Sequence, residues 1–287
     1  MAIKPTIIFT FAGRRGNMEI QLPIIQRILE TTPQTQFHIW NLSHNELDNQ
    51  YIRSIRGDGI IVRNEFYGTR EPWLRFNDVY RHYCQEGYSH VRFVKIDDDV
   101  VFLESGRFND FLDAIDANPH AVMSAKVVNN GACTPLDPGL WNEYKKLDNK
   151  GGRLDQLPLL DVHLSVDYAL ACHNYLFNNW PNLIGEPIKN IPTTDWLSIN
   201  LIGYDWTMGR RITGIIGTPF RYEIAGRNFM VGSPIGDEGA VNCIPRIVMQ
   251  GFLAGHLYFG PQAANMADDV QADLRKRYAE LGRQYLA

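Results

Sequence analysis

Short apolar runs alternate with longer amphipathic segments over the first 128 residues of the chain. Period-two and fully apolar patterns predict strands at residues 6–11, 37–40, 60–62, 90–96 and 120–128. Three- and four-residue apolar spacing predicts three helices between these strands. The first begins at Pro23, the second begins at Pro72, and the third covers residues 107–117. This alternation predicts an α/β fold, Rossmann-like, with a mostly parallel central sheet and helices on both faces.

The second half of the chain is less regular. Residues 129–185 contain glycine, proline and charged clusters before a helical pattern over 164–180, and we interpret them as an insertion over the sheet. Strands are predicted at residues 196–201 and 211–216, a helix near Asp237 and a last helix from about residue 265. We therefore expect one domain over residues 1–262, with the insertion dividing residues 1–128 from 186–262, and a C-terminal helix over 263–287. The apolar stripe of that helix packs either on the domain or on a second subunit, so an oligomer is an open alternative.

Composition adds three constraints. The formal net charge of -4 gives no general attraction to nucleic acid or to an anionic membrane, although a local basic groove remains open. No apolar stretch is long enough to span a membrane, and the run near the N-terminus lacks a cleavage site, which predicts a cytoplasmic protein without membrane contact. The four cysteines are widely separated, which is typical of buried, reduced thiols.

The sharpest chemical feature is Asp97-Asp98-Asp99, which follows a buried strand and precedes further apolar residues. Carboxylates crowded at the carboxyl end of a parallel strand repel one another and need a cation. Oxygen ligands suit Mg²⁺ or Mn²⁺. Because alternate residues of extended backbone point to the same side, we expect Asp97 and Asp99 to converge and Asp98 to turn away. The alternative is an acidic turn that caps the next element.

This segment resembles the DxD motif of GT-A glycosyltransferases. The resemblance covers roughly residues 5–128, and Arg75 and Asn77 lie one helix and one strand before the motif, as in the large inverting group. It implies a GT-A fold in which residues 1–128 bind a nucleotide sugar and Asp97 and Asp99 hold the metal, with Asp97 and Asp98 facing the donor.

Further donor contacts are expected around the ends of the first strands. Phe11 ends the first strand. Arg14 and Arg15 lie between glycines in the loop that follows, where arginine can form paired hydrogen bonds with phosphate. The alternative for these two arginines is a solvated basic turn. Asn41 stands where the family often places an acidic residue against the base. Arg70 and Arg75 are the remaining candidates for contact with the donor.

The resemblance also implies an acceptor side in residues 186–262. Asp237 and Glu238 begin a predicted helix, where orphan N–H groups keep carboxylates ionised, and either resembles the family's catalytic base. A plain helix cap is the alternative, and Asp195 is a third candidate. His256 resembles the late histidine that completes the metal shell in these enzymes, although a histidine in an apolar stretch is by default a core residue.

The sequence-based hypothesis is therefore a metal-dependent hexosyl- or pentosyltransferase that takes a sugar from a nucleoside diphosphate, with a UDP-sugar as the first expectation. The sequence does not decide whether the acceptor hydroxyl belongs to a glycan, a small molecule or a modified base in DNA. Inversion is implied, and retention stays open. Two alternatives remain: a nucleotidyltransferase acting on a sugar phosphate, for which Gly13-Arg14-Arg15-Gly16 is a weak signal, and a metal-binding module without catalysis.

Overall fold

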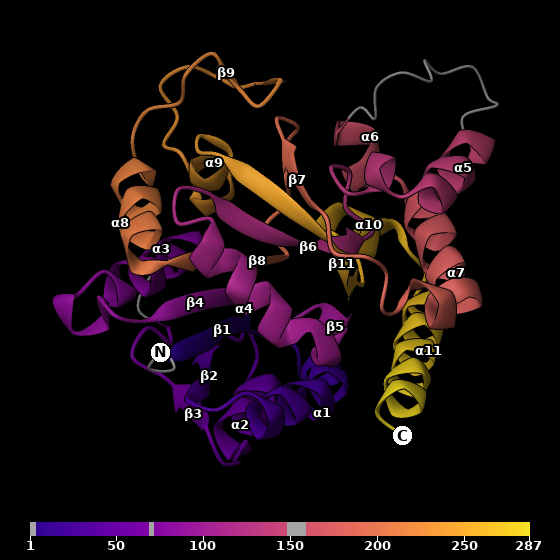
Figure 1. Ribbon diagram of the computed structural model, residues 1–287, viewed down its shortest axis with the longest axis horizontal. Coiled ribbons are helices and arrows are strands. Elements are labelled where there is room, and N and C mark those ends of the chain that lie inside the picture. Colours follow the sequence, from indigo (N-terminus) through magenta and orange to yellow (C-terminus); the bar gives the residue numbers. More distant parts are fainter. Residues whose placement is uncertain (1–3, 69–71, 148–158) are drawn as a thin grey trace.

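One large sheet organises the computed structural model, which describes residues 4–68, 72–147 and 159–287 (Figure 1). Its strand order is β3-β2-β1-β4-β8-β6-β11-β5, with β7 paired to β11. Strands β3, β2, β1, β4, β6 and β11 run in one direction, and β8, β5 and β7 run in the other. The strand bounds are β1 Thr6–Ala12, β2 Thr35–Asn41, β3 Ile60–Arg63, β4 Arg92–Asp97, β5 Val100–Leu103, β6 Val122–Val128, β7 Asn190–Thr193, β8 Leu201–Asp205 and β11 Arg246–His256. The predicted α/β fold with a mixed, mostly parallel sheet is confirmed.

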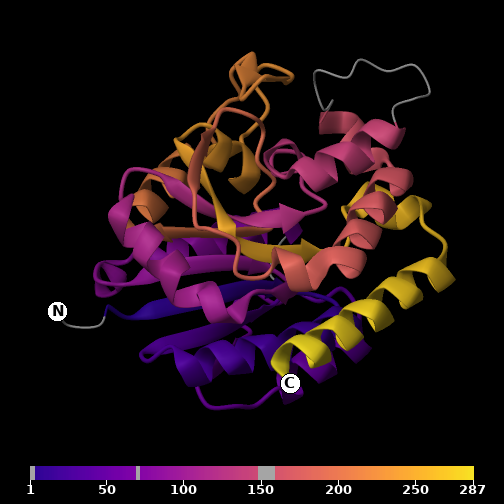
Figure 2. The same cartoon turned by 45° about the vertical axis from the view of Figure 1, so that its right-hand side comes forward.

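Helices lie on both faces of this sheet (Figures 1 and 2). Their bounds are α1 Arg15–Thr31, α2 Glu46–Ser54, α3 Pro72–Tyr83, α4 Phe108–Ala117, α5 Pro138–Leu147, α6 Leu159–Leu164, α7 Val166–Leu183, α8 Trp206–Ile215, α9 Asp237–Asn242, α10 Gly260–Asn265 and α11 Asp268–Leu286. A small hairpin joins β9 Glu223–Ile224 to β10 Arg227–Asn228 between α8 and α9. None of the helices in the described ranges is both long and apolar enough to cross a membrane.

Three element predictions are wrong. Helix α1 begins at Arg15, so Pro23 lies inside the helix instead of opening it. Residues 211–215 belong to helix α8 and Ile216 is its C-cap, and the start of the helix is capped by the Asp205 carboxylate accepting from Met208 N at 2.8 Å. Ile212, Ile215 and Ile216 fit a helical face as well as a strand, and the cap decides between them. The strand predicted at 196–201 instead starts at Leu201, and strands β5 and β11 were not predicted.

The apolar stripe of the C-terminal helix packs on the body of the same chain. Helix α11 runs alongside α1 and also contacts β5 and α7 (Figure 2). Leu274, Tyr278 and Leu281 are buried in these contacts. Of the two alternatives left open by the sequence, the structure shows this one.

Gly251 in β11 is a packing constraint that can be tested by substitution. A Cβ at this position would lie 2.8 Å from Ile188 Cα and 2.9 Å from the Glu186 carbonyl oxygen, and backbone atoms cannot rotate away. We expect Gly251→Ala to lower the free energy of unfolding by about 2–4 kcal/mol, measured by urea denaturation. Gly214→Ala is the control, because nothing lies near its added Cβ and it stands inside α8. Gly214→Ala should unfold at a urea concentration no lower than that of the parent. Equal unfolding midpoints for Gly251→Ala and Gly214→Ala would contradict the predicted steric clash at Gly251.

Candidate active site

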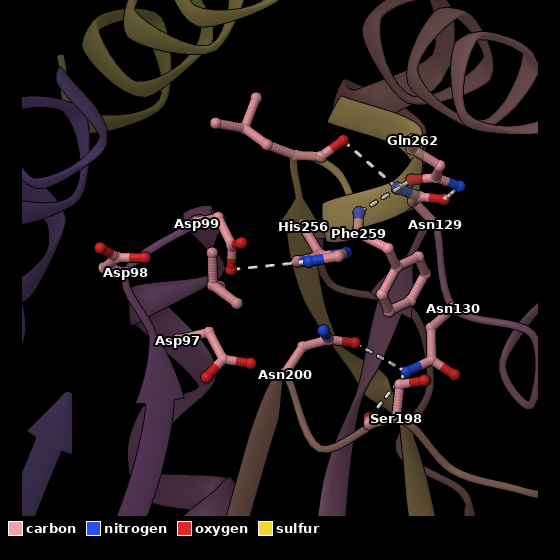
Figure 3. A network of polar contacts seen from close by, with 12 residues as sticks. Asp97, Asp98, Asp99, Asn129, Asn130, Ser198, Asn200, His256, Phe259 and Gln262 are labelled. Carbon is pink, nitrogen blue, oxygen red and sulfur yellow. Dashed lines mark hydrogen bonds and ion pairs between the residues drawn. The ribbon is translucent and has the colours of Figure 1, made fainter. Parts of the chain in front are cut away.

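The strand directions bring polar segments together at one edge of the sheet. Strands β4, β6 and β11 run in the same direction, so Asp97, Asn129-Asn130 and His256 lie at the same edge. Strand β8 runs the other way, so its preceding residue Asn200 lies there too. Figure 3 shows Asp97, Asn130, Asn200 and His256 around this edge, whereas the Asn129 side chain turns toward Gln262. Since ligands of open α/β sheets bind beyond the carboxyl ends of the strands, this edge is the candidate active site.

The backbone of the aspartate segment is held from several directions. Asp98 and Asp99 form a tight turn between β4 and β5. Buried Gln21 of α1 donates through Nε2 to the carbonyl oxygens of Asp97 and Val100, both at 2.8 Å. Leu257 N donates to Asp99 O at 2.8 Å, which ties the turn to the end of β11. The three carboxylates are therefore attached to a backbone whose position is fixed by buried hydrogen bonds.

Asp98 points away from the other two carboxylates, toward the start of α1 (Figure 3). Its Oδ2 accepts from Gly13 N at 2.8 Å and Arg14 N at 3.0 Å, and its Oδ1 accepts from the Arg14 guanidinium. The carboxylate is buried, and it lies where the helix dipole and the orphan N–H groups favour negative charge. In this structure Asp98 joins the aspartate turn to the loop after β1.

Removal of this carboxylate should act mainly on stability. We expect Asp98→Ala to lower the free energy of unfolding by about 3–5 kcal/mol, because two N–H groups and a guanidinium lose a buried acceptor. Chemical denaturation monitored by circular dichroism measures the change. Asp116→Ala is a matched control, since its carboxylate also pairs with an arginine, Arg92, but is half exposed; a loss no larger than that of Asp116→Ala would contradict the role assigned to Asp98.

Asp99 faces His256 across the turn. Its Oδ2 accepts from Arg14 Nη2 at 2.7 Å, whereas its buried Oδ1 has no hydrogen-bond donor and lies 3.5 Å from His256 Nε2. Burial alone would raise the pKa of Asp99, but the charges of Arg14 and His256 dominate and hold this pKa well below its usual range. Asp99 is therefore an ionised carboxylate with one oxygen left unsatisfied beside an imidazole nitrogen.

Asp97 is paired with a buried lysine. Lys95 Nζ donates to Asp97 Oδ1 and, at 2.7 Å, to the carbonyl oxygen of Ile199. Burial raises the pKa of Asp97 to about 6, an effect that Lys95 opposes and Asp99 reinforces. When all three aspartates are ionised and His256 is neutral, as a metal ligand must be, Arg14 and Lys95 neutralise two of the three negative charges and one is left in excess. An excess charge of this kind in a largely buried site favours a bound cation.

These residues fit a divalent cation that is held only in part by protein. Within the described part of the chain, no three His, Cys, Asp or Glu side chains are arranged as a ready metal cluster. Asp99 Oδ1 and His256 Nε2 are nevertheless an oxygen and a nitrogen ligand facing the same space, with Asp97 beside them (Figure 3). Mg²⁺ and Mn²⁺ commonly take only one or two carboxylates and complete their shell with water and substrate phosphate. Asp99 and His256, with Asp97 beside them, provide a small number of protein ligands of this kind.

Asp237 and Glu238 lie in the first turn of α9, as the sequence predicted. Trp196 Nε1 donates to Glu238 Oε1, and Asp237 Oδ1 accepts from Glu238 N at 2.9 Å. Burial raises the pKa of both carboxyls, that of Glu238 to about 7. The segment from Trp196 to Ile199 joins this pair to the site of Asp97, because Trp196 donates to Glu238 and the Ile199 carbonyl oxygen accepts from Lys95 at 2.7 Å. Asp195, in contrast, is exposed on the segment before Trp196.

The candidates for donor contact occupy different surroundings. Phe11 stacks on Phe76 of α3 with ring centroids 4.7 Å apart, next to the Lys95 ammonium. The Asn41 side chain is buried and bonded to Asn49, Asn64 and Ser43. Arg75 is buried with no hydrogen-bond acceptor for its Nε, and Arg70 lies outside the described residues. Their roles toward a nucleotide stay predictions.

The structure adds residues that the sequence analysis missed. Asn130 Nδ2 donates to Ser198 O at 2.8 Å and to Asn200 Oδ1 at 2.9 Å, and His163 Nε2 lies 2.9 Å from Ser198 Oγ. Lys95 had a local signal, a charge inside an apolar strand, and Asn129-Asn130 had one too, a polar pair directly after a strand. The positions of Ser198, Asn200 and His163 follow from tertiary structure alone.

Comparison with known proteins adds little beyond the fold. No protein-family model matches the chain, and no curated protein matches it. Among solved structures, the chain is similar to that of S. aureus TarS, residues 1–349, at 10% sequence identity and a TM-score of 0.43, with 96% of this chain and 70% of that chain covered. The function proposed below is therefore based on the site residues themselves.

Proposed function

We propose that this chain is a metal-dependent glycosyltransferase, which moves a sugar from a nucleoside-diphosphate sugar to an acceptor hydroxyl with inversion. The observation that carries the proposal is the composition of the sheet edge. Asp99 and His256, an unsatisfied carboxylate oxygen and an imidazole nitrogen 3.5 Å apart, lie at the same edge as the half-buried carboxyl of Glu238, whose pKa is raised to about 7. The pair of Asp99 and His256 suits a diphosphate leaving group, and Glu238 suits removal of a hydroxyl proton.

Each half of this site has a distinct task in the proposed reaction. Asp99 and His256 are the residues that would hold Mg²⁺ or Mn²⁺, with Asp97 beside them. When bound, such an ion stabilises the negative charge that develops on the departing diphosphate. Arg14 at the start of α1 keeps Asp99 ionised and oriented. Phe11 and Arg75 are proposed to contact the nucleotide.

Glu238 is the better candidate of the two for the base. A base works best when its pKa lies near the operating pH, and burial raises the pKa of Glu238 to about 7. The indole of Trp196 donates to Oε1 and so orients the carboxylate, and we assign Oε2 to the acceptor hydroxyl. Asp237 supports it through the backbone of the same turn. Transfer of the acceptor proton to Glu238 leaves the acceptor oxygen free to attack the sugar from the face opposite the diphosphate.

Product analysis tests this proposal against the nucleotidyltransferase alternative. The protein is incubated with Mn²⁺ and UDP-, GDP- or CDP-sugars, and slow hydrolysis of the donor is followed by chromatography in the absence of acceptor. The proposal expects a nucleoside diphosphate and free sugar from one of the donors. Pyrophosphate release from a nucleoside triphosphate and a sugar phosphate would instead identify a nucleotidyltransferase and overturn the proposal.

A further inference from the structure

Arg227, on the hairpin between α8 and α9, is held by aromatic rings near Glu238. Its guanidinium lies 4.8 Å from the ring centroid of Trp196 and 5.0 Å from that of Phe229. Phe229 in turn stacks on Phe220 with centroids 4.3 Å apart. The packed rings restrict the position of the Arg227 guanidinium through cation–π contacts.

The donors of this guanidinium are not used by the protein. Across residues 4–68, 72–147 and 159–287, Arg227 makes no ion pair, and no acceptor receives a hydrogen bond from its side chain. Arg14 and Lys95, the cations of the opposite half of the site, are both paired with aspartates. The aromatic rings accept no conventional hydrogen bond from Arg227, so its N–H groups remain available to a planar or tetrahedral oxyanion.

The position of Arg227 places that oxyanion on the acceptor side. The indole of Trp196 contacts Arg227 with its ring and donates from Nε1 to Glu238, so Arg227 and the proposed base flank one aromatic side chain. Trp196 belongs to the segment that continues to Ser198, whose Oγ lies 2.9 Å from His163 Nε2, so Arg227 contacts the segment that leads to the sheet edge. The pair of Asp99 and His256, where the donor diphosphate is expected, belongs to the turn after β4 and the end of β11.

We infer that Arg227 selects an acceptor that carries an oxyanion, a phosphate or a carboxylate, close to the hydroxyl that receives the sugar. The assignment of this side as the acceptor side rests on the proposed function, whereas oxyanion binding at Arg227 does not. A guanidinium forms paired, charge-assisted hydrogen bonds with either group. A neutral acceptor would leave this charge without a partner.

The test is nuclear magnetic resonance of the full-length protein labelled with ¹⁵N at arginine Nε. The Arg227 resonance is assigned by its absence in Arg227→Lys, and the protein is titrated with dimethyl phosphate, with acetate and with neutral trimethyl phosphate. We expect a saturable shift of this resonance with at least one anion and none with the neutral ester. Stronger binding of dimethyl phosphate indicates a phosphate-bearing acceptor, and stronger binding of acetate indicates a carboxylate.

Two variants and one competitor make the test decisive. Arg227→Gln removes the Arg227 resonance, so its anion binding is followed through the indole Nε1–H resonance of Trp196, which contacts Arg227. This variant should weaken anion binding at least about tenfold, as expected for loss of a charged hydrogen bond. Arg221→Gln, an exposed arginine just before the hairpin, should leave anion binding unchanged. No anion-dependent shift at Arg227, or an equal loss in Arg221→Gln, overturns the inference. Displacement of the anion by UDP with Mg²⁺ also overturns it, because Arg227 would then contact the donor. Failure of UDP to bind at all would count against the proposed function alone.

Discussion

Asp99→Asn should reduce donor turnover by about 1,000-fold, the largest single loss expected for this site. The substitution keeps the shape of the side chain but removes the charge that faces His256 at 3.5 Å. Without that charge the excess negative charge of the aspartate turn disappears, and with it the attraction for a cation. Loss of a few kcal/mol of charge stabilisation at the leaving group corresponds to a factor of this size.

The loss should be accompanied by loss of metal dependence, which separates it from simple unfolding. Donor hydrolysis is measured over a Mn²⁺ titration for the parent and the variant. Asp113→Asn, on the exposed side of α4, makes the same change of charge away from the site and should behave like the parent. A variant Asp99→Asn that retains metal-stimulated turnover within threefold of the parent would contradict the assigned role of Asp99.

The second large effect is expected from Glu238→Gln, which should lower the rate of transfer by about 10²–10⁴-fold, the usual contribution of a general base. Because burial raises the pKa of Glu238 to about 7, the parent should lose activity as the pH falls through this value and Glu238 becomes protonated. The residual activity of the variant should lack this acidic limb, since glutamine does not titrate.

Asp237→Asn is the matched control for the same turn of α9. It should reduce the rate less than Glu238→Gln and keep the acidic limb, because Asp237 accepts from the backbone of the turn through Oδ1. Nucleotide affinity should be unchanged in both variants. If Asp237→Asn instead gives the larger loss and abolishes the limb, Asp237 is the base and the assignment to Glu238 is wrong.

Sequence patterns predicted the strands of the first half well except for β5, because most of their residues are buried and the intervening helices have clear apolar faces. Extended backbone predicted that Asp97 and Asp99 converge while Asp98 turns away, but Asp98 and Asp99 form a tight turn and share the Arg14 guanidinium, and Asp99 also faces His256. The convergence of Asp97 and Asp99 on a metal stays a prediction. The second half was harder for a physical reason. Residues 211–216 carry an apolar pattern that suits a helix or a strand, and the cap at Asp205 that decides between them is not an apolar signal.

The acceptor side of the candidate site depends on contacts that no local pattern reveals. The side chains of Trp196 and Glu238 meet although they are far apart in the chain, and Arg227 joins them from a hairpin of two very short strands. Such contacts depend on how α9 and the hairpin pack on the sheet edge, which periodicity does not specify. The roles proposed for these residues therefore rest on the structure and on the experiments given above.

Calorimetric titration with UDP, GDP and CDP, each with Mn²⁺ and again with excess chelator, tests the central claim most directly. We expect one nucleoside diphosphate to bind, its binding to disappear with chelator, and Asp99→Asn to abolish it while Asp113→Asn does not. Binding that is indifferent to chelator, or no binding of any of the three, would contradict a metal-held diphosphate at Asp99 and His256.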